Sequence, residues 1–328
     1  MTHEQRRLQH SQQHVEQHLQ LQHQAVELRM VSDFRPDLMA GKVLVITGGA
    51  TGIGFGICQG FGRHGAKVVL CGRRQDALDE ACGKLRGEGI ACLGVTCDVR
   101  DAARCEFVIA EALRAFGKVD FLVNNAAGNF STTIENLSTN GFKTVLDIDT
   151  VGSFNMSKAA LPALKANGGG VIIHTTATLH YKSMPFQMAA SAAKAAIDTM
   201  TNNMAIEWGE YNIRVVSIAP GPIENTVGGP TGRVFGEMMK KAPSAASKNL
   251  YMQVPIGRFG TVEDIANTAL FVCSPSGSFI NATSVVVDGG QWHQASGVYL
   301  MAKDHIAKAS QRERGSHKGG VASGKAKL

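Results

Sequence analysis

The chain has 328 residues, of which 44% are hydrophobic, 18% charged and 6% aromatic, and its formal net charge is +6. No run of about 18 or more apolar residues predicts a helix that spans a membrane, and no apolar stretch follows the first charges as it would in a secretory signal. Many basic residues gather in residues 303–328 without aromatic companions, so the charge indicates a solvated tail and no nucleic-acid interface.

Composition divides the chain into three zones. Residues 1–41 form a Gln- and His-rich extension, residues 42–292 alternate β-branched runs with helical patterns, and residues 293–328 form a basic, flexible tail. Three histidines of the extension follow a helical spacing that would place them on one face, as a metal site requires: His10, His14 and His18. They lack an acidic or cysteine companion, so we expect a partly helical, solvated extension and no metal.

Short apolar runs recur through the middle zone, separated by helical patterns. Strands are predicted at 42–47, 67–71, 91–96, 120–125, 171–175, 213–218 and 284–288. Buried parallel strands have continuous apolar sequences of this kind. The βαβα rhythm predicts an α/β fold with a doubly wound, Rossmann-type parallel sheet, in a single domain with terminal extensions. The seven scattered cysteines lack a CxxC pair, so we expect reduced thiols and no disulfide framework.

The first predicted strand runs into the sequence TGGATGIG, residues 47–54. Its glycines permit a tight turn and a close approach of phosphate to the backbone, and the next helix would offer free N–H groups. A glycine cluster also occurs in plain turns, but here it lies between a strand and a helix, as dinucleotide binding requires. The residues predicted to bind are Thr47, Gly48, Gly52, Ile53 and Gly54.

The second predicted strand ends in Gly72, Arg73 and Arg74. An NAD site would place an acidic residue here for the ribose hydroxyls, whereas arginine suits the 2′-phosphate of NADP(H). We therefore predict NADP(H); two solvated arginines are the alternative. After the third strand, Asp98 and Val99 are predicted to meet the adenine, unless Asp98 is only a helix N-cap.

Further motifs follow in order: NNAAG at 124–128, PGPI at 220–223 and DGG at 288–290. With the glycine-rich turn, they make residues 40–292 similar to the short-chain dehydrogenase/reductase family. The resemblance implies cofactor contacts from Asn125, Lys194, Pro220, Gly221, Ile223 and Thr226. The PGPI turn would meet the nicotinamide end, Lys194 its ribose, and Thr226 either the nicotinamide or the pyrophosphate.

The expected catalytic residues depart from the usual family pattern. Lys194 matches the family lysine, but Ala190 stands where the acid tyrosine belongs, and Asp149 replaces an asparagine. Carbonyl reduction needs a proton donor at the carbonyl oxygen, so ordinary ketone chemistry is disfavoured. The segments NNAAGNF, DIDT, TATLHY and PGPIENT resemble the subfamily of peroxisomal 2,4-dienoyl-CoA reductases, which shares both departures.

This resemblance implies NADPH-dependent reduction of a 2,4-dienoyl-CoA to a 3-enoyl-CoA during β-oxidation of unsaturated fatty acids. Asp149 and Lys194 would hold the water that protonates the α-carbon, although Asp149 alternatively only orients Lys194. Thr178 would donate to the thioester oxygen. The substrate-facing residues would be Arg100, Asn129, Phe130, Ser138 and Asn140, and residues 224–250 are expected to cover the site.

Two other functions remain open at this point. One is a 3-oxoacyl thioester or other carbonyl reductase that uses Tyr181 as a displaced acid; the other is a nucleotide-binding scaffold without activity. The chain ends in Ala326, Lys327 and Leu328, a variant of the peroxisomal SKL address. It predicts import into a peroxisome or glycosome by its receptor. The resemblance also implies a homotetramer.

Overall fold

The computed structural model describes residues 33–184, 186–224, 226 and 254–293. The three histidines of the extension, most of the predicted cover and the C-terminal tripeptide lie outside these residues. Within them, no helix is long and apolar enough to cross a membrane, and no cluster of residues suited to holding a metal ion occurs.

The core of the fold is one parallel sheet in the order β3-β2-β1-β4-β5-β6-β7. Its strands are β1 (Val43–Thr47), β2 (Lys67–Gly72), β3 (Cys92–Thr96), β4 (Phe121–Asn124), β5 (Gly170–Thr175), β6 (Ile213–Pro220) and β7 (Thr283–Val287). Every predicted strand is confirmed within two residues at each end. The doubly wound α/β sheet is therefore confirmed.

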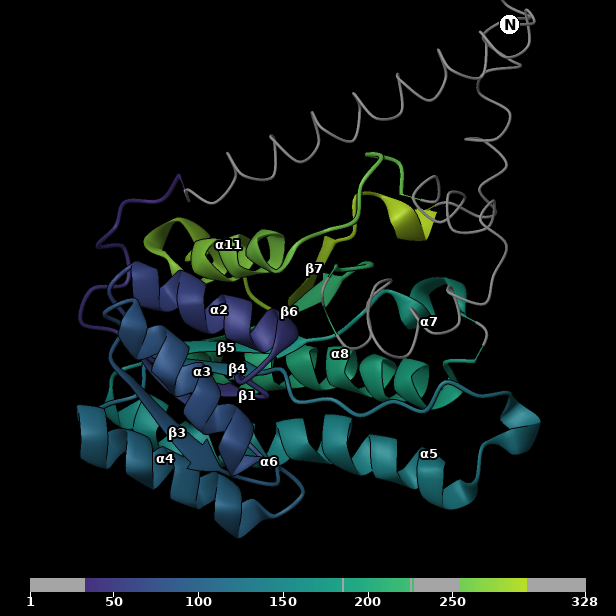
Figure 1. The fold of residues 1–328 in the computed structure, drawn as a ribbon, viewed down its shortest axis with the longest axis horizontal. Helices are drawn as coiled ribbons and strands as arrows, with labels where there is room; N and C mark the ends of the chain where they lie inside the picture. Colours follow the sequence, from purple (N-terminus) through teal and green to yellow (C-terminus); the bar gives the residue numbers. More distant parts are fainter. Residues whose placement is uncertain (1–32, 185, 225, 227–253, 294–328) are drawn as a thin grey trace, which may run out of the picture.

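Helices cover both faces of the sheet (Figure 1). One face carries α2 (Gly52–Arg63), α3 (Gln75–Gly87) and α11 (Val262–Cys273), and the other carries α4 (Ala102–Phe116), α6 (Gly152–Ala166) and α8 (Met188–Trp208). The remaining elements are η2 (Ile134–Asn136), α5 (Thr139–Leu146), the π-helical turn η3 (Asp147–Val151), α7 (Leu179–Lys182), η4 (Gly209–Tyr211), η5 (Pro275–Gly277) and η6 (Gln291–His293).

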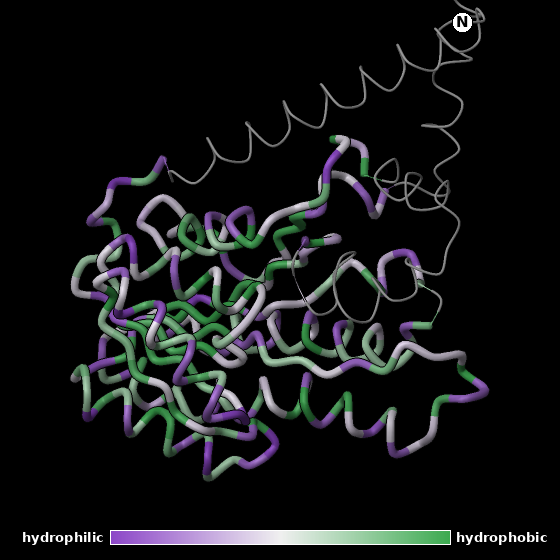
Figure 2. The backbone as a smooth tube through the Cα atoms, viewed as in Figure 1, coloured by the Kyte–Doolittle hydropathy of each residue, from purple (hydrophilic) through white to green (hydrophobic). Residues whose placement is uncertain are grey.

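Two apolar cores lie between these layers because successive strand residues point to opposite faces. In β1, Leu44 and Ile46 pack towards α2 and α11, whereas Val45 packs towards α4 and α6. Figure 2 shows the hydrophobic strands at the centre of the molecule. All seven cysteines are free thiols, as expected, and six of them are buried.

The chain order reverses at the centre of the sheet. From β1 it runs outward through β2 and β3, and then returns to place β4 on the other side of β1. In open parallel sheets, this reversal leaves a crevice beyond the carboxyl ends of the central strands, where ligands bind. The loops after β1 and β4 meet at this crevice.

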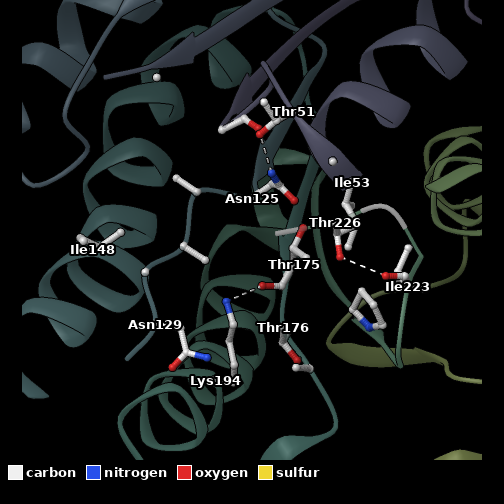
Figure 3. A pocket seen from close by; sticks show the side chains of 18 of the residues that line it. Thr51, Ile53, Asn125, Asn129, Ile148, Thr175, Thr176, Lys194, Ile223 and Thr226 are labelled. Atoms are coloured by element: carbon white, nitrogen blue, oxygen red, sulfur yellow. Dashed lines mark hydrogen bonds between the residues drawn. The ribbon is translucent and has the colours of Figure 1, made fainter. Parts of the chain in front are cut away.

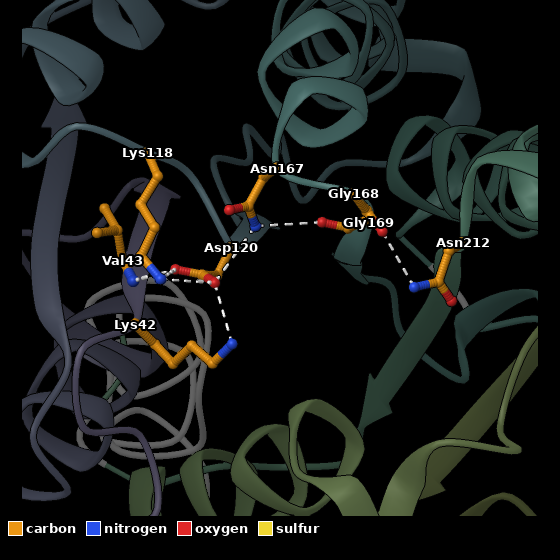
Figure 4. Close-up of polar contacts among 8 residues, drawn as sticks. All are labelled: Lys42, Val43, Lys118, Asp120, Asn167, Gly168, Gly169 and Asn212. Carbon is orange, nitrogen blue, oxygen red and sulfur yellow. Dashed lines mark hydrogen bonds and ion pairs between the residues drawn. The ribbon is translucent and has the colours of Figure 1, made fainter.

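The opposite end of the sheet is held by a buried carboxylate, Asp120, which is 2% exposed. It accepts from the backbone N–H of Val43 at 2.8 Å and from the amines of Lys42 and Lys118 at 3.1 and 3.2 Å (Figure 4). Burial alone would raise the pKa of this carboxyl, but these donors outweigh it and hold the pKa below its usual value. Asp120 thus ties the start of β1 to the start of β4.

Replacing Asp120 with asparagine is expected to lower the free energy of unfolding by about 2 kcal/mol. The amide would keep an acceptor but lose the charge that both lysines face, and hydrogen bonds to charged groups contribute about 1.5–3 kcal/mol each. Urea unfolding of both proteins measures the difference. The matched control is Asp37→Asn, which breaks an exposed pair with Arg35 and should change stability by under about 0.5 kcal/mol. Equal, small effects of both changes would contradict the prediction.

Candidate active site

The turn between β1 and α2 is shaped by glycines. Gly48 and Gly52 have φ angles of +64° and +55°, which favour glycine, and a Cβ on Gly54 would lie 2.3 Å from the carbonyl oxygen of Gly48. Asn125 fixes the turn from β4 by donating its Nδ2 to the carbonyl oxygens of Thr47 and Gly48, each at 3.2 Å. The turn therefore presents backbone and the N-terminus of α2 to the crevice.

The hydroxyl of Thr47, at the end of β1, in turn holds the start of the loop after β4. Its Oγ1 accepts from the backbone N–H groups of Asn125 and Ala126, each at 2.9 Å. Thr47 and Gly54 are not among the residues that line the cavity. Their effect on a ligand would therefore be indirect, through the shape of the turn.

A cavity of about 710 Å³ fills the crevice (Figure 3). Most residues predicted to bind a cofactor or substrate line it: Gly48, Gly52, Ile53, Arg73, Arg74, Asp98, Val99, Asn125, Asn129, Thr178, Lys194, Pro220, Gly221, Ile223 and Thr226. They come from the carboxyl ends of six different strands and from the loops and helices, α2 and α8 among them, that follow these strands. The structure thus brings together residues that the sequence spreads over some 180 positions.

The cavity end beside β2 and β3 is basic. Arg73 and Arg74 are exposed at the end of β2, and Asp98 forms an ion pair with Arg100. The hydrogen bond from the Arg100 side chain is the main cause that lowers the pKa of Asp98; the backbone N–H of Arg100 and the charge of Arg73 add to it. The N-cap alternative for Asp98 is wrong, because the cap of α4 is Asp101, whose side chain accepts from two backbone N–H groups of the first turn.

Four predicted substrate residues, by contrast, do not line the cavity: Arg100, Phe130, Ser138 and Asn140. Arg100 is engaged by Asp98, and Ser138 is the N-cap of α5, where its hydroxyl accepts from Gly141 at 3.0 Å. Phe130 is half exposed beside the cavity residue Asn129. Of the predicted substrate residues, only Asn129 therefore reaches the cavity wall.

Lys194 projects from α8 towards the middle of the cavity. Its Nζ donates to the carbonyl oxygen of Thr175 at 3.1 Å and lies 3.0 Å from Oδ2 of Asp149. Asp149 is 1% exposed and comes from the π-helical turn η3. The two charges account for each other's burial, because a buried ion is tolerated only with a close partner.

The two oxygens of Asp149 differ in their surroundings. Oδ1 accepts from the backbone N–H of Gly128 at 2.7 Å. Oδ2 lies 3.0 Å from Nζ of Lys194 as its ion-pair partner, and it accepts no further hydrogen bond within the described part of the chain. Oδ2 therefore keeps its capacity to accept from a water molecule or a ligand.

Ala190 lies one helical turn before Lys194 and is buried. No phenol is therefore placed beside the lysine from this position.

Thr176 and Thr178 line the same region of the cavity and are 3% and 4% exposed. The hydroxyl of Thr176 is buried without a hydrogen-bond partner among the described residues. An unpaired buried hydroxyl costs free energy unless a ligand completes it, so Thr176, which the sequence places with Thr175 and Thr178 in the region of the family serine, is a candidate contact.

Sequence reasoning missed Gln187, which links two walls of the cavity. Its amide accepts from Asn129 at 2.6 Å and donates to Ser131 at 3.0 Å. The preceding Phe186 has a φ angle of +66°, and its carbonyl oxygen accepts from Thr132 at 3.3 Å. The two partner segments lie over 50 residues apart, so no local motif indicates this contact.

Comparisons with known proteins agree with this geometry. Residues 48–291 match the family model described as enoyl-(acyl carrier protein) reductase. The peroxisomal 2,4-dienoyl-CoA reductase of Arabidopsis thaliana is 46% identical over 272 residues, which cover 80% of this chain and 88% of that protein. That of Rattus norvegicus is 45% identical over 260 residues, covering 79% and 86%.

Two solved dehydrogenase structures are also similar to this chain. A short-chain dehydrogenase from Bacillus anthracis is 39% identical and superposes with a TM-score of 0.70, covering 78% of this chain and 98% of that one. A citronellol catabolism dehydrogenase from Pseudomonas aeruginosa is 28% identical, with a TM-score of 0.68 and coverages of 80% and 99%. The similarity extends over nearly the whole length of both structures.

Proposed function

This chain belongs to the short-chain dehydrogenase/reductase family, and from that premise we propose that it is an NADPH-dependent reductase of 2,4-dienoyl-CoA thioesters. The observation that carries the proposal is the pairing of Lys194 with the buried Asp149, together with an alanine one turn before the lysine. This arrangement lacks an acid for a carbonyl oxygen but has a buried acid–base pair, of which Lys194 lines the cavity and Asp149 lies behind it.

The family uses a nicotinamide nucleotide, and the residues present fit one. A Cβ on Gly54 would fill the turn, and the N-terminus of α2 offers the free N–H groups that bind pyrophosphate. Thr226 lies beside this N-terminus, because a Cβ on Gly52 would be 3.6 Å from its methyl group. It is therefore placed to contact a nucleotide bound there. Lys194 and Asn125 would meet the nicotinamide ribose, and Pro220, Gly221 and Ile223 would border the nicotinamide ring. Arg73 would grip the 2′-phosphate.

The reaction makes two demands on this chain's own residues. When bound, reduced nicotinamide supplies a hydride to the δ-carbon of the dienoyl thioester. The negative charge that then reaches the thioester oxygen must be stabilised by donors, and Thr178 and the unpaired hydroxyl of Thr176 are available for this role. Donors fixed at that oxygen before reaction would lower the barrier because they need no reorganisation.

The second demand is a proton at the α-carbon. Oδ2 of Asp149 would orient a water molecule by accepting one of its O–H groups, and Nζ of Lys194 would donate to the same water. The water would give its other proton to the α-carbon and take one from the Lys194 ammonium, which solvent would then reprotonate. The positive charge of Lys194 makes such a water a better donor. General acid–base catalysis of this kind contributes about 10²- to 10⁴-fold to a rate. The product would be a 3-enoyl-CoA.

The carbonyl-reductase alternative depends on Tyr181, and its surroundings argue against that role. Its hydroxyl donates to Asp198 and accepts from Ser284, each at 3.0 Å, and its ring packs edge-on against Trp292. Burial, above all, raises the pKa of Tyr181, whereas an acid–base tyrosine needs a lowered one. Tyr181 is not among the cavity-lining residues.

Replacing Tyr181 with phenylalanine should therefore leave kcat for a 2,4-dienoyl-CoA within about threefold of the unaltered protein. Only the two hydrogen bonds are lost, at a cost of about 1 kcal/mol each in stability. Steady-state NADPH oxidation measures kcat, and thermal unfolding measures the stability cost. A fall in kcat of a hundredfold or more, in a folded variant, would restore Tyr181 as the acid.

One assay separates the three candidate functions. Purified protein is mixed with NADPH and either a 2,4-dienoyl-CoA or a 3-oxoacyl-CoA, and NADPH absorbance is followed. We expect oxidation only with the dienoyl thioester, and a 3-enoyl-CoA as product. Oxidation only with the oxo thioester would refute the proposal. NADPH binding without turnover of either thioester would favour the scaffold.

The setting of this function is proposed from the sequence and the relatives. The relatives from Arabidopsis thaliana and Rattus norvegicus are named as peroxisomal enzymes. The terminal Ala326, Lys327 and Leu328 would address this chain to a peroxisome or glycosome through the import receptor. We propose a homotetramer, and contacts from Arg100, Phe130, Ser138 and Asn140 to the substrate beyond the cavity. Residues 1–41, 42–292 and 293–328 would be the extension, the catalytic domain and the tail.

A further inference from the structure

A chain of four buried polar side chains crosses the layer beneath the cavity. No member is more than 3% exposed, and each comes from a different element: Asn124 from β4, Ser157 from α6, His174 from β5 and Thr201 from α8. Polar groups buried this deeply are costly unless every hydrogen bond is made. The chain is therefore a costly feature that a simple apolar core would have avoided.

One direction of donation satisfies the contacts of this chain together. When Thr201 donates its hydroxyl to the carbonyl oxygen of Ile197 at 2.9 Å, it accepts from Nδ1 of His174, 2.8 Å away. In this arrangement the ring carries its proton on Nδ1. Its Nε2 then accepts from the hydroxyl of Ser157 at 3.3 Å, and Ser157 in turn accepts from the amide of Asn124 at 2.8 Å.

The histidine at the centre of the chain stays neutral. Burial, and secondarily the charge of Lys194, lowers the pKa of His174 to about 3. A second proton on the ring would turn Nε2 from an acceptor into a donor, and the bond from Ser157 would be lost. The neutral form with Nδ1–H thus makes every hydrogen bond that joins the four side chains, while Oδ1 of Asn124 has no partner among the described residues.

This chain lies directly below the catalytic pair. On the α6 side, Asp149 precedes Ser153 by four residues and Ser157 by eight; Ser153 donates to the carbonyl oxygen of Asp149, and all three are buried. On the α8 side, Lys194 and Thr201 are two helical turns apart and both buried. His174 therefore joins α8, which carries Lys194, to α6, which continues the turn η3 that carries Asp149, and does so about two turns away from the pair.

A second connection runs through the backbone of β5. His174 is followed by Thr175, whose carbonyl oxygen accepts from Nζ of Lys194. A shift of the imidazole would therefore move the carbonyl oxygen of Thr175, which accepts from Lys194. It would also change the distance between α6 and α8. Both routes end at the contact between Lys194 and Asp149.

We propose that His174 is a positioning residue, whose neutral Nδ1–H form sets the spacing of α6 and α8 and thereby holds Asp149 and Lys194 in contact. It does not line the cavity. The proposal deepens the proposed function and rests on it for its kinetic consequence. Its structural consequence, the geometry of the pair, can be measured independently.

His174→Leu is the test variant, because leucine fills a similar volume but makes neither hydrogen bond. We expect kcat for a 2,4-dienoyl-CoA to fall at least tenfold, with KM and the Kd of NADPH within about twofold. His174→Gln, whose amide offers a donor and an acceptor, should recover part of the loss. The control is Leu164→Ala, which opens the same core at the far end of α6 and should lower Tm without lowering kcat well below Tm.

Crystal structures and nitrogen NMR separate this proposal from the proposed function. In wild-type protein the imidazole should remain in the Nδ1–H form from pH 5.5 to 8, and in His174→Leu the Nζ–Oδ2 distance should lengthen. An Nε2–H or charged ring, an unchanged distance, or a kcat loss no larger than that of Leu164→Ala would overturn the positioning role. Wild-type protein that keeps this geometry but does not reduce dienoyl-CoA would instead refute the proposed function alone.

Discussion

Replacing Asp149 with asparagine is expected to lower kcat for a 2,4-dienoyl-CoA by about 100- to 1,000-fold, within the range for loss of a general acid–base group. The amide keeps the shape of the side chain and an acceptor for Gly128. It loses the charge beside Lys194 and the ability to take and return a proton. Stopped-flow and steady-state NADPH oxidation would measure the loss.

Cofactor binding is the discriminating second readout for this variant. Asp149 is buried behind Lys194 and does not line the cavity, so the Kd of NADPH should change by no more than about threefold. Asp147→Asn is the matched control, because Asp147 lies in the same π-helical turn but pairs with the exposed Lys143. Unchanged turnover in Asp149→Asn would leave Asp149 with only an orienting role, and the proton would need another route.

Replacing Arg73 with aspartate is expected to raise the Kd of NADPH by about 100-fold and to change the Kd of NADH by less than about fivefold. Hydrogen bonds between charged partners contribute about 1.5–3 kcal/mol, and a carboxylate at this place would also repel the 2′-phosphate. The same carboxylate could accept from the ribose hydroxyls of NADH, as acidic residues do at NAD sites. Quenching of protein fluorescence by each cofactor measures both constants.

The control for this prediction is Arg86→Asp, which makes the same charge change in the last turn of α3, far from the cavity. It corrects for the general effect of net charge on an anionic ligand. If Arg73→Asp weakened both cofactors equally, or matched Arg86→Asp, the choice of NADPH would have no support from this residue. Arg74 would then be the next residue to test.

Some features of this molecule were predictable because they are encoded locally. Each buried strand is a continuous apolar run, so the seven strands could be located from a few residues each. The turn after β1 carries its own glycines. The contact between Asp149 and Lys194 was expected from resemblance, and the structure places their charged atoms 3.0 Å apart. Their catalytic roles remain predictions.

Other features depend on contacts between distant segments, which no single stretch reveals. Gln187 acts on residues more than 50 positions earlier, and nothing in its neighbours distinguishes it from a solvated glutamine. His174 looks like a β-strand residue until α6 and α8 supply its partners. Asp98 illustrates the converse, because two aspartates precede α4 and only the geometry identifies Asp101 as its cap.

The clamp formed by Asp120 with Val43, Lys42 and Lys118 lies at the opposite end of the strands from the cavity. This separation matters for redesign. Val43 begins β1 under the clamp, and four residues later Thr47 supports the turn at the cavity. Changes in the loops that carry Asn129, Ser131 and Gln187 leave the clamp intact. A library of variants in those loops would therefore change the cavity wall while it keeps the stabilising contacts of Asp120. Stabilising substitutions around Asp120 could then be added without a new selection for activity.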